Sequence, residues 1–325
     1  MRQPLELQAS RPMRIHDGVV VTTTDVWATL DASYRGDLAR VRDLTDRCPT
    51  LATCQYDYTS PLHLAVREGH LEVAKLLVAR GGIDPGYRTH PYLESLLIVV
   101  SDRGLHEMEA FITTSLADPA LVRARGDTGR IERGFDAEQL RFQDAVDRGE
   151  VAEVEAQLRA RPDLATDPDL FYGEGILASP ANSNNRAMVD LLLRFGAAVP
   201  AMSKWPKEYY FKHLEMAAHL LAHGMDPNHR TWRDVTLLHD LCFAGALPKV
   251  QLLVDHGASL DLIDDEFRST PLGLAARQGH RDVVTFLLAR GAHPRGAGAP
   301  WATPLTWAHA RGHEAIAQDL QAAGA

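Results

Sequence analysis

Cysteine is scarce in this chain: only Cys48, Cys54 and Cys242 occur in 325 residues. Their number is odd and no two of them have a Cys-x-x-Cys spacing, so the sequence offers no paired thiolate ligands for a metal. We interpret them as small buried or incidental side chains. Few and unpaired thiols are typical of a reducing compartment, and we expect the protein to be cytoplasmic.

The start of the chain lacks a long apolar run. Residues 1–24 precede the first helical pattern, and their Val19-Val20-Val21 run is too short for a signal peptide or a membrane span. We therefore expect no membrane attachment. We also expect this segment to be an N-terminal tail and the exception in a chain that is otherwise folded throughout.

Positive charge is in deficit, with 34 Lys and Arg against 43 Asp and Glu and a formal net charge of −9. This balance argues against a nucleic-acid-binding surface, which needs cations against phosphate. It weakly favours a basic partner. Asp261, Asp264, Asp265 and Glu266 concentrate acid in one short segment, although a solvated loop would look the same.

Signatures of catalysis are missing as well. The sequence has no phosphate-cradling glycine loop and no nucleophile elbow, so we expect neither an enzyme nor a cofactor. The histidines leave one alternative, a metal-dependent site among His213, His219, His223 and His229. His219 and His223 are four residues apart on one predicted helix, a spacing that can bind metal. However, His223 suits the last turn of that helix, and no third ligand at a fixed spacing completes a site, so we expect no bound metal.

Glycine, in contrast, recurs at a regular spacing. Gly245, Gly279 and Gly312 follow one another at steps of 34 and 33 residues, and a second glycine lies twelve residues after each. The pair Gly69 and Gly81 has the same spacing of twelve. A period in this range means that one supersecondary unit is copied and stacked.

The unit around Gly69 predicts a pair of short helices. Ser60 can cap the first helix and Pro61 suits its first turn, where no amide donor is needed. Gly69 can adopt the left-handed conformation that ends this helix, and a second apolar helix then runs to Gly81. Each helix is only about two turns long, too short to be stable alone in water. Stability must therefore come from stacking on neighbouring units.

Four copies of the unit match the signature Thr-Pro-Leu-His-x-Ala, Gly-His-x-x-Val-Val-x-Leu-Leu, Gly-Ala at several positions each. They are Ser60-Pro61-Leu62-His63 with Gly69-His70, Thr236-Leu237-Leu238-His239 with Gly257-Ala258, Thr270-Pro271-Leu272 with Gly279-His280 and Gly291-Ala292, and Thr303-Pro304-Leu305 with Gly312-His313. In these residues the chain resembles the ankyrin-repeat family. The departures are Gly273 and Thr306, where the signature has His, and Leu237, where it has Pro.

The resemblance implies an all-α fold, an ankyrin-repeat solenoid of about nine helix–turn–helix units with short β-hairpin loops. We expect one continuous superhelix over residues 25–325. The units are expected to start near residues 25, 59, 92, 137, 172, 203, 235, 269 and 302. The period fails around 92–136, where roughly a dozen residues are inserted, and around 200–212, so we expect irregular units there. Residues 124–130 are glycine-rich and charged and predict a surface loop.

The resemblance also assigns structural work to the recurring histidines. His63 and His239 occupy the signature position, where the family's imidazole bonds to nearby backbone. Four others begin second helices at a repeating position: His70, His213, His280 and His313. Leu272 and Trp307 are expected on the buried sides of their first helices.

The function that the resemblance implies is non-catalytic binding of a partner protein through the concave face formed by hairpins and inner helices. Aromatic residues recur at or near the expected hairpin tips, and such residues dominate interface energetics. They are Tyr56, Tyr58, Tyr92, Phe171, Tyr172, Trp232, Phe267 and Trp301. We expect an exposed row of binding residues on a monomeric scaffold. The alternatives are that each ring packs on the neighbouring hairpin, and that the chain is a spacer or self-associating subunit.

Overall fold

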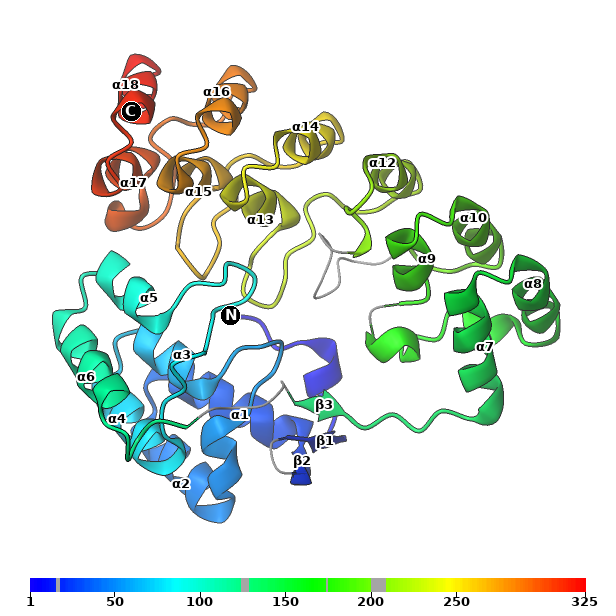
Figure 1. Ribbon diagram of the computed structural model, residues 1–325, viewed down its shortest axis with the longest axis horizontal. Coiled ribbons are helices and arrows are strands. Elements are labelled where there is room, and N and C mark those ends of the chain that lie inside the picture. Colours follow the sequence, from blue (N-terminus) through cyan, green and yellow to red (C-terminus); the bar gives the residue numbers. More distant parts are fainter. Residues whose placement is uncertain (16–17, 124–128, 174, 200–208) are drawn as a thin grey trace. The chain divides into compact units, whose positions relative to one another are not determined.

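The computed structural model describes residues 1–15, 18–123, 129–173, 175–199 and 209–325, and most of its regular structure is helical (Figure 1). The α-helices are α1 (Thr23–Arg35), α2 (Leu38–Arg47), α3 (Pro61–Arg67), α4 (Leu71–Gly81), α5 (Leu96–Asp102), α6 (His106–Ala117), α7 (Ala137–Arg148), α8 (Val151–Ala160), α9 (Ala178–Asn182), α10 (Arg186–Arg194), α12 (Leu214–Ala222), α13 (Leu237–Phe243), α14 (Leu247–Asp255), α15 (Pro271–Gln278), α16 (Arg281–Ala289), α17 (Pro304–Ala310) and α18 (Glu314–Ala322). The remaining elements are the 3-10 helices η1 (Leu5–Leu7), η3 (Pro49–Thr53), η4 (Pro162–Ala165), η5 (Leu170–Gly173) and η6 (Pro300–Ala302), and the strands β1 (Pro12–Arg14), β2 (Val20–Thr22) and β3 (Arg130–Ile131).

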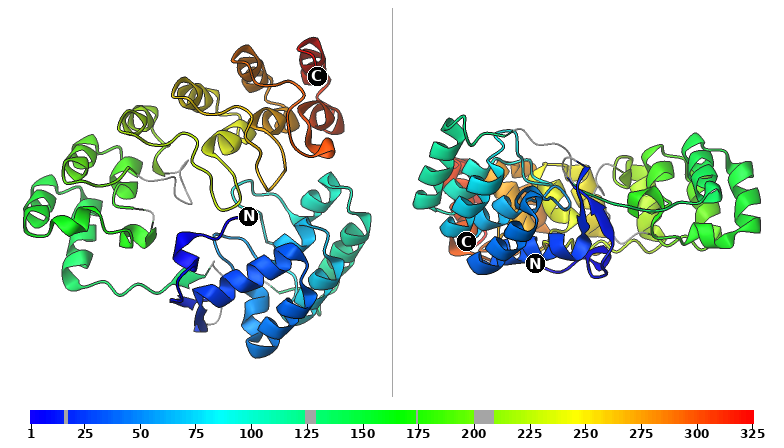
Figure 2. Two further views of the ribbon diagram at one scale, coloured as in Figure 1. Left: turned by 180° about the vertical axis from the view of Figure 1, so that it is seen from behind. Right: turned by 90° about the horizontal axis from the view of Figure 1, so that it is seen from below.

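The helices come in antiparallel pairs that repeat along the chain. Within the described residues there are eight pairs, from α1–α2 to α17–α18, together with α12. The first helix expected before α12 falls on residues 200–208, which lie outside the described part of the chain. First helices α13, α15 and α17 form one row and second helices α14, α16 and α18 another, as the left-hand view of Figure 2 shows. The all-α architecture of stacked helix pairs expected from the sequence is confirmed.

The ends of the short helices are fixed by the residues that the signature places there. The side chains of Ser60 and Thr270 accept hydrogen bonds from the amides of His63 (3.1 Å) and Gly273 (3.2 Å), three residues into each helix. Proline follows each cap as the first helical residue. Gly279 ends α15 with φ of 81°, a left-handed conformation that costs glycine little.

Three of these glycines also lie against a histidine of the next unit. His280 donates a hydrogen bond from Nε2 to the carbonyl oxygen of Phe243 (3.0 Å), and a Cβ atom at Gly245 would lie 2.5 Å from its ring. The same arrangement holds for the pairs Gly36–His70 and Gly279–His313. The repeating histidines therefore have the structural role expected of them, since each ties one unit to the one before.

The repeats fall into two compact units, and one continuous superhelix over residues 25–325 stays a prediction. One unit is Gln3–Glu132, and the other comprises Met1–Arg2 with Arg133–Ala325. Each has its own apolar core, the first built around residues such as Val66 and Leu77, the second around residues such as Leu238 and Leu272. The division falls at the insertion between α6 and α7.

Most of the segment expected to be an unfolded tail is part of the N-terminal unit. β1 pairs antiparallel with β2 and with β3 in a sheet of order β2-β1-β3, in which Met13 lies opposite both Val21 and Ile131. Leu7, Met13 and Val21 are buried, and both η1 and β2 contact α1. This segment therefore covers part of the first helix pair, as a capping element of a repeat array does. Its strands are only three residues long, so the alternation of buried and exposed side chains is too short to predict them from the sequence.

The insertion after α6 runs back over its own unit. The amide of Ile83 donates to the carbonyl oxygen of Leu121 (2.8 Å), and the amide of Arg123 donates to the carbonyl oxygen of Ile83 (2.9 Å). β3 then joins the N-terminal sheet. Of the predicted surface loop at 124–130, residues 124–128 lie outside the described part of the chain.

Candidate functional site

Three consecutive hairpin loops project from the C-terminal unit, between α12 and α13, between α14 and α15, and between α16 and α17. Asp234 and Arg268 occupy equivalent positions at the tips of the first two, and both have positive φ, 57° and 51°. Polar residues tolerate this left-handed conformation better than branched ones. A backbone hydrogen bond closes each of these two loops, from the amide of Thr231 to the carbonyl oxygen of Val235 in the first and from the amide of Asp264 to that of Ser269 in the second.

Backbone hydrogen bonds tie these hairpins to one another. The amide of Asp265 donates to the carbonyl oxygen of Arg233 (3.0 Å), which joins the first hairpin to the second. The amide of Ala299 donates to the carbonyl oxygen of Arg268 (3.0 Å), which joins the second to the third. The three tips are therefore held at fixed spacing, which lowers the entropic cost of binding an extended partner.

A buried ion pair reinforces the first of these connections. Arg233 and Glu266 are both buried, with 3.3 Å between the guanidinium Nη1 and the carboxylate Oε2. The guanidinium carbon of Arg233 also lies 5.4 Å from the centre of the Trp232 ring. Removing one partner of such a pair leaves a charge buried, so each residue fixes the position of the other.

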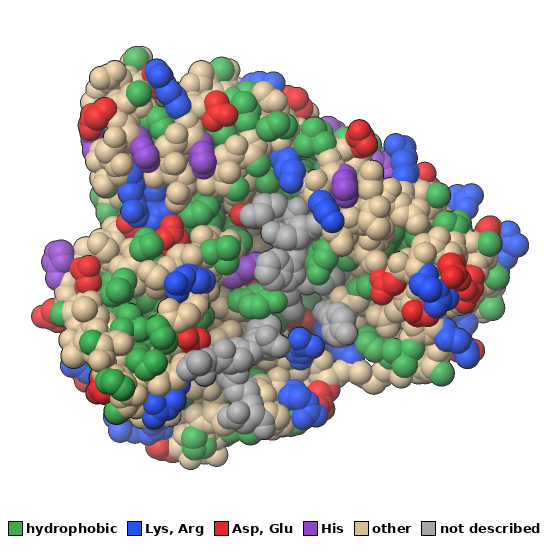
Figure 3. All heavy atoms as spheres, viewed as in Figure 1, with side chains coloured by type: hydrophobic (Ala, Val, Ile, Leu, Met, Phe, Trp, Pro, Cys, Tyr) green, Lys and Arg blue, Asp and Glu red, His purple; other side chains and the backbone are tan. Residues whose placement is uncertain are grey.

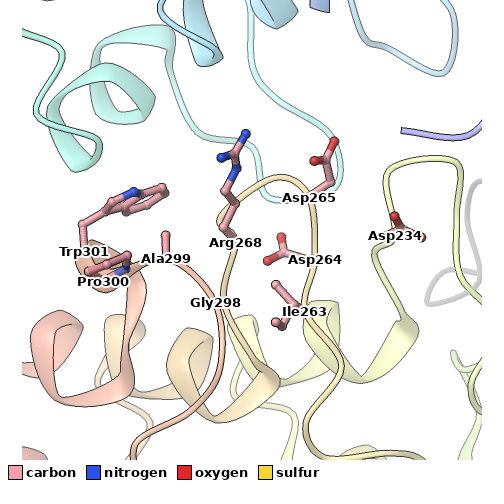
Figure 4. Close-up of a pocket in the computed structure, with 9 residues that line it drawn as sticks. All are labelled: Asp234, Ile263, Asp264, Asp265, Arg268, Gly298, Ala299, Pro300 and Trp301. Carbon is pink, nitrogen blue, oxygen red and sulfur yellow. The ribbon is translucent and has the colours of Figure 1, made fainter.

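The tips enclose a hollow of about 550 Å³. Figure 4 shows Trp301 on one side of it and Asp234 on the other, with the second hairpin between them. The residues lining it are Asp234, Ile263, Asp264, Asp265, Arg268, Gly298, Ala299, Pro300 and Trp301. Asp264 has a structural role, because its carboxylate accepts hydrogen bonds from the amides of Phe267 (2.9 Å) and Ser269 (3.0 Å).

The sequence predicted Trp301 here and showed the acidic segment that contains Asp264 and Asp265, but Asp234 and Arg268 were not predicted. Asp234 and Arg268 are 34 residues apart, so the repeat period that located the helices also places these two at one position of successive units.

The predicted row of exposed aromatic residues is not present. Four of the eight are buried, namely Tyr56, Tyr92, Trp232 and Phe267. Tyr58, Phe171 and Trp301 are half-buried, and the side chain of Tyr172, in η5, lies outside the described part of the structure. Large rings close to the helix ends gain more by packing than by exposure, so they stabilise the hairpins.

The C-terminal rings form one cluster around a cation. Phe267 is stacked on Phe243 and lies edge-on to Trp307, which in turn lies edge-on to Trp301 at a centroid distance of 5.7 Å. The guanidinium carbon of Arg277 lies 4.5 Å from the centre of the Phe267 ring. Phe267 therefore packs on rings of α13 and α17, and Trp301 packs on Trp307 of α17 while its side chain stays half-buried. The predicted burial of Trp307 is confirmed.

The N-terminal aromatics are held in the same way. The hydroxyl of Tyr56 donates to a carboxylate oxygen of Glu6 (2.6 Å), and the ring of Tyr58 lies 5.3 Å from that of His90. The hydroxyl of Tyr87 lies 2.9 Å from Nδ1 of His63. These contacts belong to the packing of the N-terminal unit.

The histidines weighed as a metal site make other contacts. His213 donates to the carbonyl oxygen of Asn182 (3.1 Å), and Nε2 of His219 lies 2.6 Å from a carboxylate oxygen of Asp190. Nδ1 of His223 donates to the carbonyl oxygen of His219, and burial lowers the pKa of His229. Within the described residues, no three His, Cys, Asp or Glu side chains gather as ligands for a metal ion.

His239 shows the backbone role that the signature implied. Its Nε2 donates to the carbonyl oxygen of Leu262 (2.9 Å), which links α13 to the next hairpin, and its Nδ1 accepts from the amide of Thr236 (3.2 Å). Burial lowers the pKa of His239 to about 4, so the ring is neutral at physiological pH.

The net negative charge is not gathered in one place on the face that Figure 3 shows. Acidic and basic side chains are interspersed there, among hydrophobic and uncharged polar ones. In the described part of the chain, no helix has the combination of length and apolarity needed to cross a bilayer.

Comparison with known proteins identifies the repeats. A family model described as three copies of ankyrin repeats matches residues 208–297, and a single ankyrin repeat model matches residues 57–90. The first covers the first two hairpins and the start of the third, and the second covers α3 and α4. Together they match three of the four units that carry the signature.

Curated relatives share only the repeats. The chain is 37% identical over 76 residues to the palmitoyltransferase Hip14 of Drosophila melanogaster, which is 23% of this chain and 12% of that protein. It is 38% identical over 71 residues to the human ankyrin repeat domain-containing protein 63, which is 22% of this chain and 18% of that protein. The matched regions thus span less than a fifth of the length of these relatives.

A solved structure shares the fold. The crystal structure of an ankyrin repeat domain from Acinetobacter baumannii superposes with a TM-score of 0.50 at 23% sequence identity, covering 57% of this chain and 98% of that domain. The stacked helix pairs and this structural likeness agree on the fold, and the family-model matches identify residues 57–90 and 208–297 as ankyrin repeats.

Proposed function

We propose that this protein is a non-catalytic binding module and that its partner protein lies across the tips of the three C-terminal hairpins. Ankyrin repeats in general are protein–protein interaction modules, which supports the broad class. One structural observation carries the location. The three tips are tied together by backbone hydrogen bonds and line a hollow of about 550 Å³.

The hollow suits a protein segment better than it suits a substrate. Its lining combines an indole ring, aliphatic side chains and both signs of charge, which is the composition of a specific protein contact. The binding residues proposed here differ from the aromatic row expected from the sequence, because Phe267 and Trp232 are buried in the packing. Trp301, Asp265 and Arg268 line the hollow instead.

Site-specific photo-cross-linking in the source cells tests the location. A benzophenone amino acid at Ala297, an exposed position in the third hairpin, is expected to capture the partner. The matched control is the same amino acid at Thr285, which is exposed on the outer helix α16. Capture at position 285 but not at 297 would overturn the proposal.

We further propose that the protein acts as a monomer in the cytoplasm. Cys242 is a buried thiol and Cys48 a half-buried one, and neither forms a disulfide, which supports a reducing compartment. Light scattering at micromolar concentration is expected to give the monomer mass of 35.8 kDa. A stable dimer or larger assembly would favour the self-associating spacer instead.

A further inference from the structure

The first hairpin tip of the C-terminal unit already holds a cationic side chain of the same chain. Met1–Arg2 belong to this unit, and Nη2 of Arg2 lies 3.2 Å from Oδ1 of Asp234. The amide of Arg2 donates to the carbonyl oxygen of Trp232 (2.8 Å), so the backbone is bound as well as the side chain. A short segment carrying an arginine therefore fits this tip.

The carboxylate of Asp234 has unused hydrogen-bonding capacity. Its Oδ1 atom is buried, and no donor among the described residues makes a hydrogen bond to it. The two ion-pair contacts of this oxygen are with Arg2 and with Nε of Arg230, at 3.2 Å and 3.4 Å. A buried oxygen left in this state calls for an explanation, and a ligand that donates to it is one.

The contact with Arg2 is of a kind that a partner can displace. The Arg2 side chain is 62% exposed, and exposed ion pairs contribute little to stability. Asp265, on the neighbouring tip, lines the same hollow and supplies a second carboxylate. The overall negative charge of the protein also favours the approach of a basic segment.

We propose that Asp234 is the receptor for an arginine side chain of the partner and that Arg2 occupies this receptor until the partner displaces it. This inference rests on the proposed function and adds the chemistry of the partner, a segment rich in arginine. Arginine is favoured over lysine because its planar guanidinium can donate two hydrogen bonds to one carboxylate. The carbonyl oxygen of Trp232 then accepts from the partner's backbone, as it does now from Arg2.

The test uses a fluorescein-labelled peptide, Gly-Ser-Arg-Gly-Arg-Ser-Gly, with lysine and citrulline versions as probes of charge and shape. Binding to the full-length protein is followed by fluorescence anisotropy. We expect the order arginine, lysine, citrulline, with citrulline at least tenfold weaker. Asp234→Asn should weaken arginine-peptide binding about tenfold, the value of a charge-assisted hydrogen bond. Arg2→Ala should strengthen it by up to about fivefold, because the competitor is lost.

Two controls keep the result interpretable. Asp255→Asn removes the same charge from the same unit, at an exposed carboxylate of α14 that pairs with Arg290, and should leave binding unchanged. Asp234→Glu keeps the charge and should retain part of the affinity. If Asp234→Asn fails to fold, Arg2→Ala remains decisive, since an arginine-specific gain supports the proposal and no gain overturns it.

Equal binding of the citrulline peptide, or full binding by a folded Asp234→Asn variant, would overturn the arginine receptor. Neither result affects the proposed function, which is judged by cross-linking at Ala297. A partner that cross-links there equally well in the Asp234→Asn variant refutes only the receptor. Absence of the hairpin cross-link refutes the proposed function.

Discussion

Single residues in this protein are constrained by the unit next to them as much as by their own helix. Gly245 shows two constraints at one position, a φ of 68° and an imidazole ring at the place of the missing Cβ. His239 shows a buried titratable group whose two ring nitrogens both have partners. Both cases lead to measurable consequences.

Substituting Gly245 should cost more than substituting an equivalent glycine with free space. Gly257 has a φ of 89°, but nothing lies within 4 Å of its Cβ position. Gly257→Ala should therefore cost about 1 to 2 kcal/mol, the penalty for the left-handed conformation alone. Gly245→Ala should cost more, because the ring of His280 must move and lose its hydrogen bond. Urea denaturation of both variants, and of each combined with His280→Ala, separates the two contributions. Equal costs for the two glycines would contradict this account.

The C-terminal unit should become less stable as the pH is lowered, because of His239. The pKa of this residue is about 4 when folded, below the value of 6.5 for the free side chain, because burial disfavours the charged ring. Between pH 6.5 and pH 4 the His239 ring is protonated in the unfolded chain but not in the folded one. The contribution of the neutral, buried ring to stability is therefore complete above pH 6.5 and is lost as the pH falls toward 4. The loss should reach about 3 kcal/mol.

Denaturation at pH 7 and pH 4.5 checks this expectation. The difference between the two pH values should shrink in His239→Gln, which cannot titrate. The control, His256→Gln, changes an exposed residue and should keep the wild-type difference. A pH dependence unchanged by His239→Gln would place the effect elsewhere.

At the scale of elements, the helices could be predicted from the sequence and the hairpins could not. Ser60, Thr270 and the glycines act through local rules of capping and chain reversal, so their pattern predicted helix ends without knowledge of the fold. The orientation of Phe267 depends instead on the rings of Phe243 and Trp307 in two other helices, which no local pattern encodes. The short strands of the N-terminal sheet were missed because two or three residues carry too little periodicity.

Substituting three tryptophans of the C-terminal unit one at a time should show which of them stabilise the fold and which bind the partner. Trp307 is 1% exposed and contacts two other rings, so Trp307→Ala should destabilise the unit by about 3 to 5 kcal/mol. Trp232 is also buried, and its substitution should lower the melting temperature as well. Trp301 is half-buried and lines the hollow, so Trp301→Ala should cost less stability and more partner affinity. Melting temperature and partner binding measured on the same three variants give the comparison. Equal losses of stability for Trp301→Ala and Trp307→Ala, with partner binding intact, would make Trp301 a packing residue only.

At the scale of the whole molecule, the chain is two repeat arrays, each with its own core. The sequence predicted the irregularity between α6 and α7 but not its consequence, because the period alone does not say whether stacking resumes across an insertion. In a repeat array each unit depends on its neighbours, so damage spreads along one stack. The two units should therefore unfold independently of each other.

Matched substitutions in the two cores test this break. Leu272 in α15 and Leu77 in α4 are both buried, with side chains 1% and 0% exposed. Each Leu→Ala change should lower the free energy of unfolding by about 2 to 5 kcal/mol. Hydrogen exchange on the full-length protein should show Leu272→Ala loosening amides within Arg133–Ala325 while those of Gln3–Glu132 keep their protection. Leu77→Ala should give the reverse pattern. Each variant serves as the control for the other, because chemistry and burial are the same and only the unit differs. Uniform loosening of the whole chain by either substitution would mean that the two cores unfold as one, since a single cooperative unit exposes all its amides together.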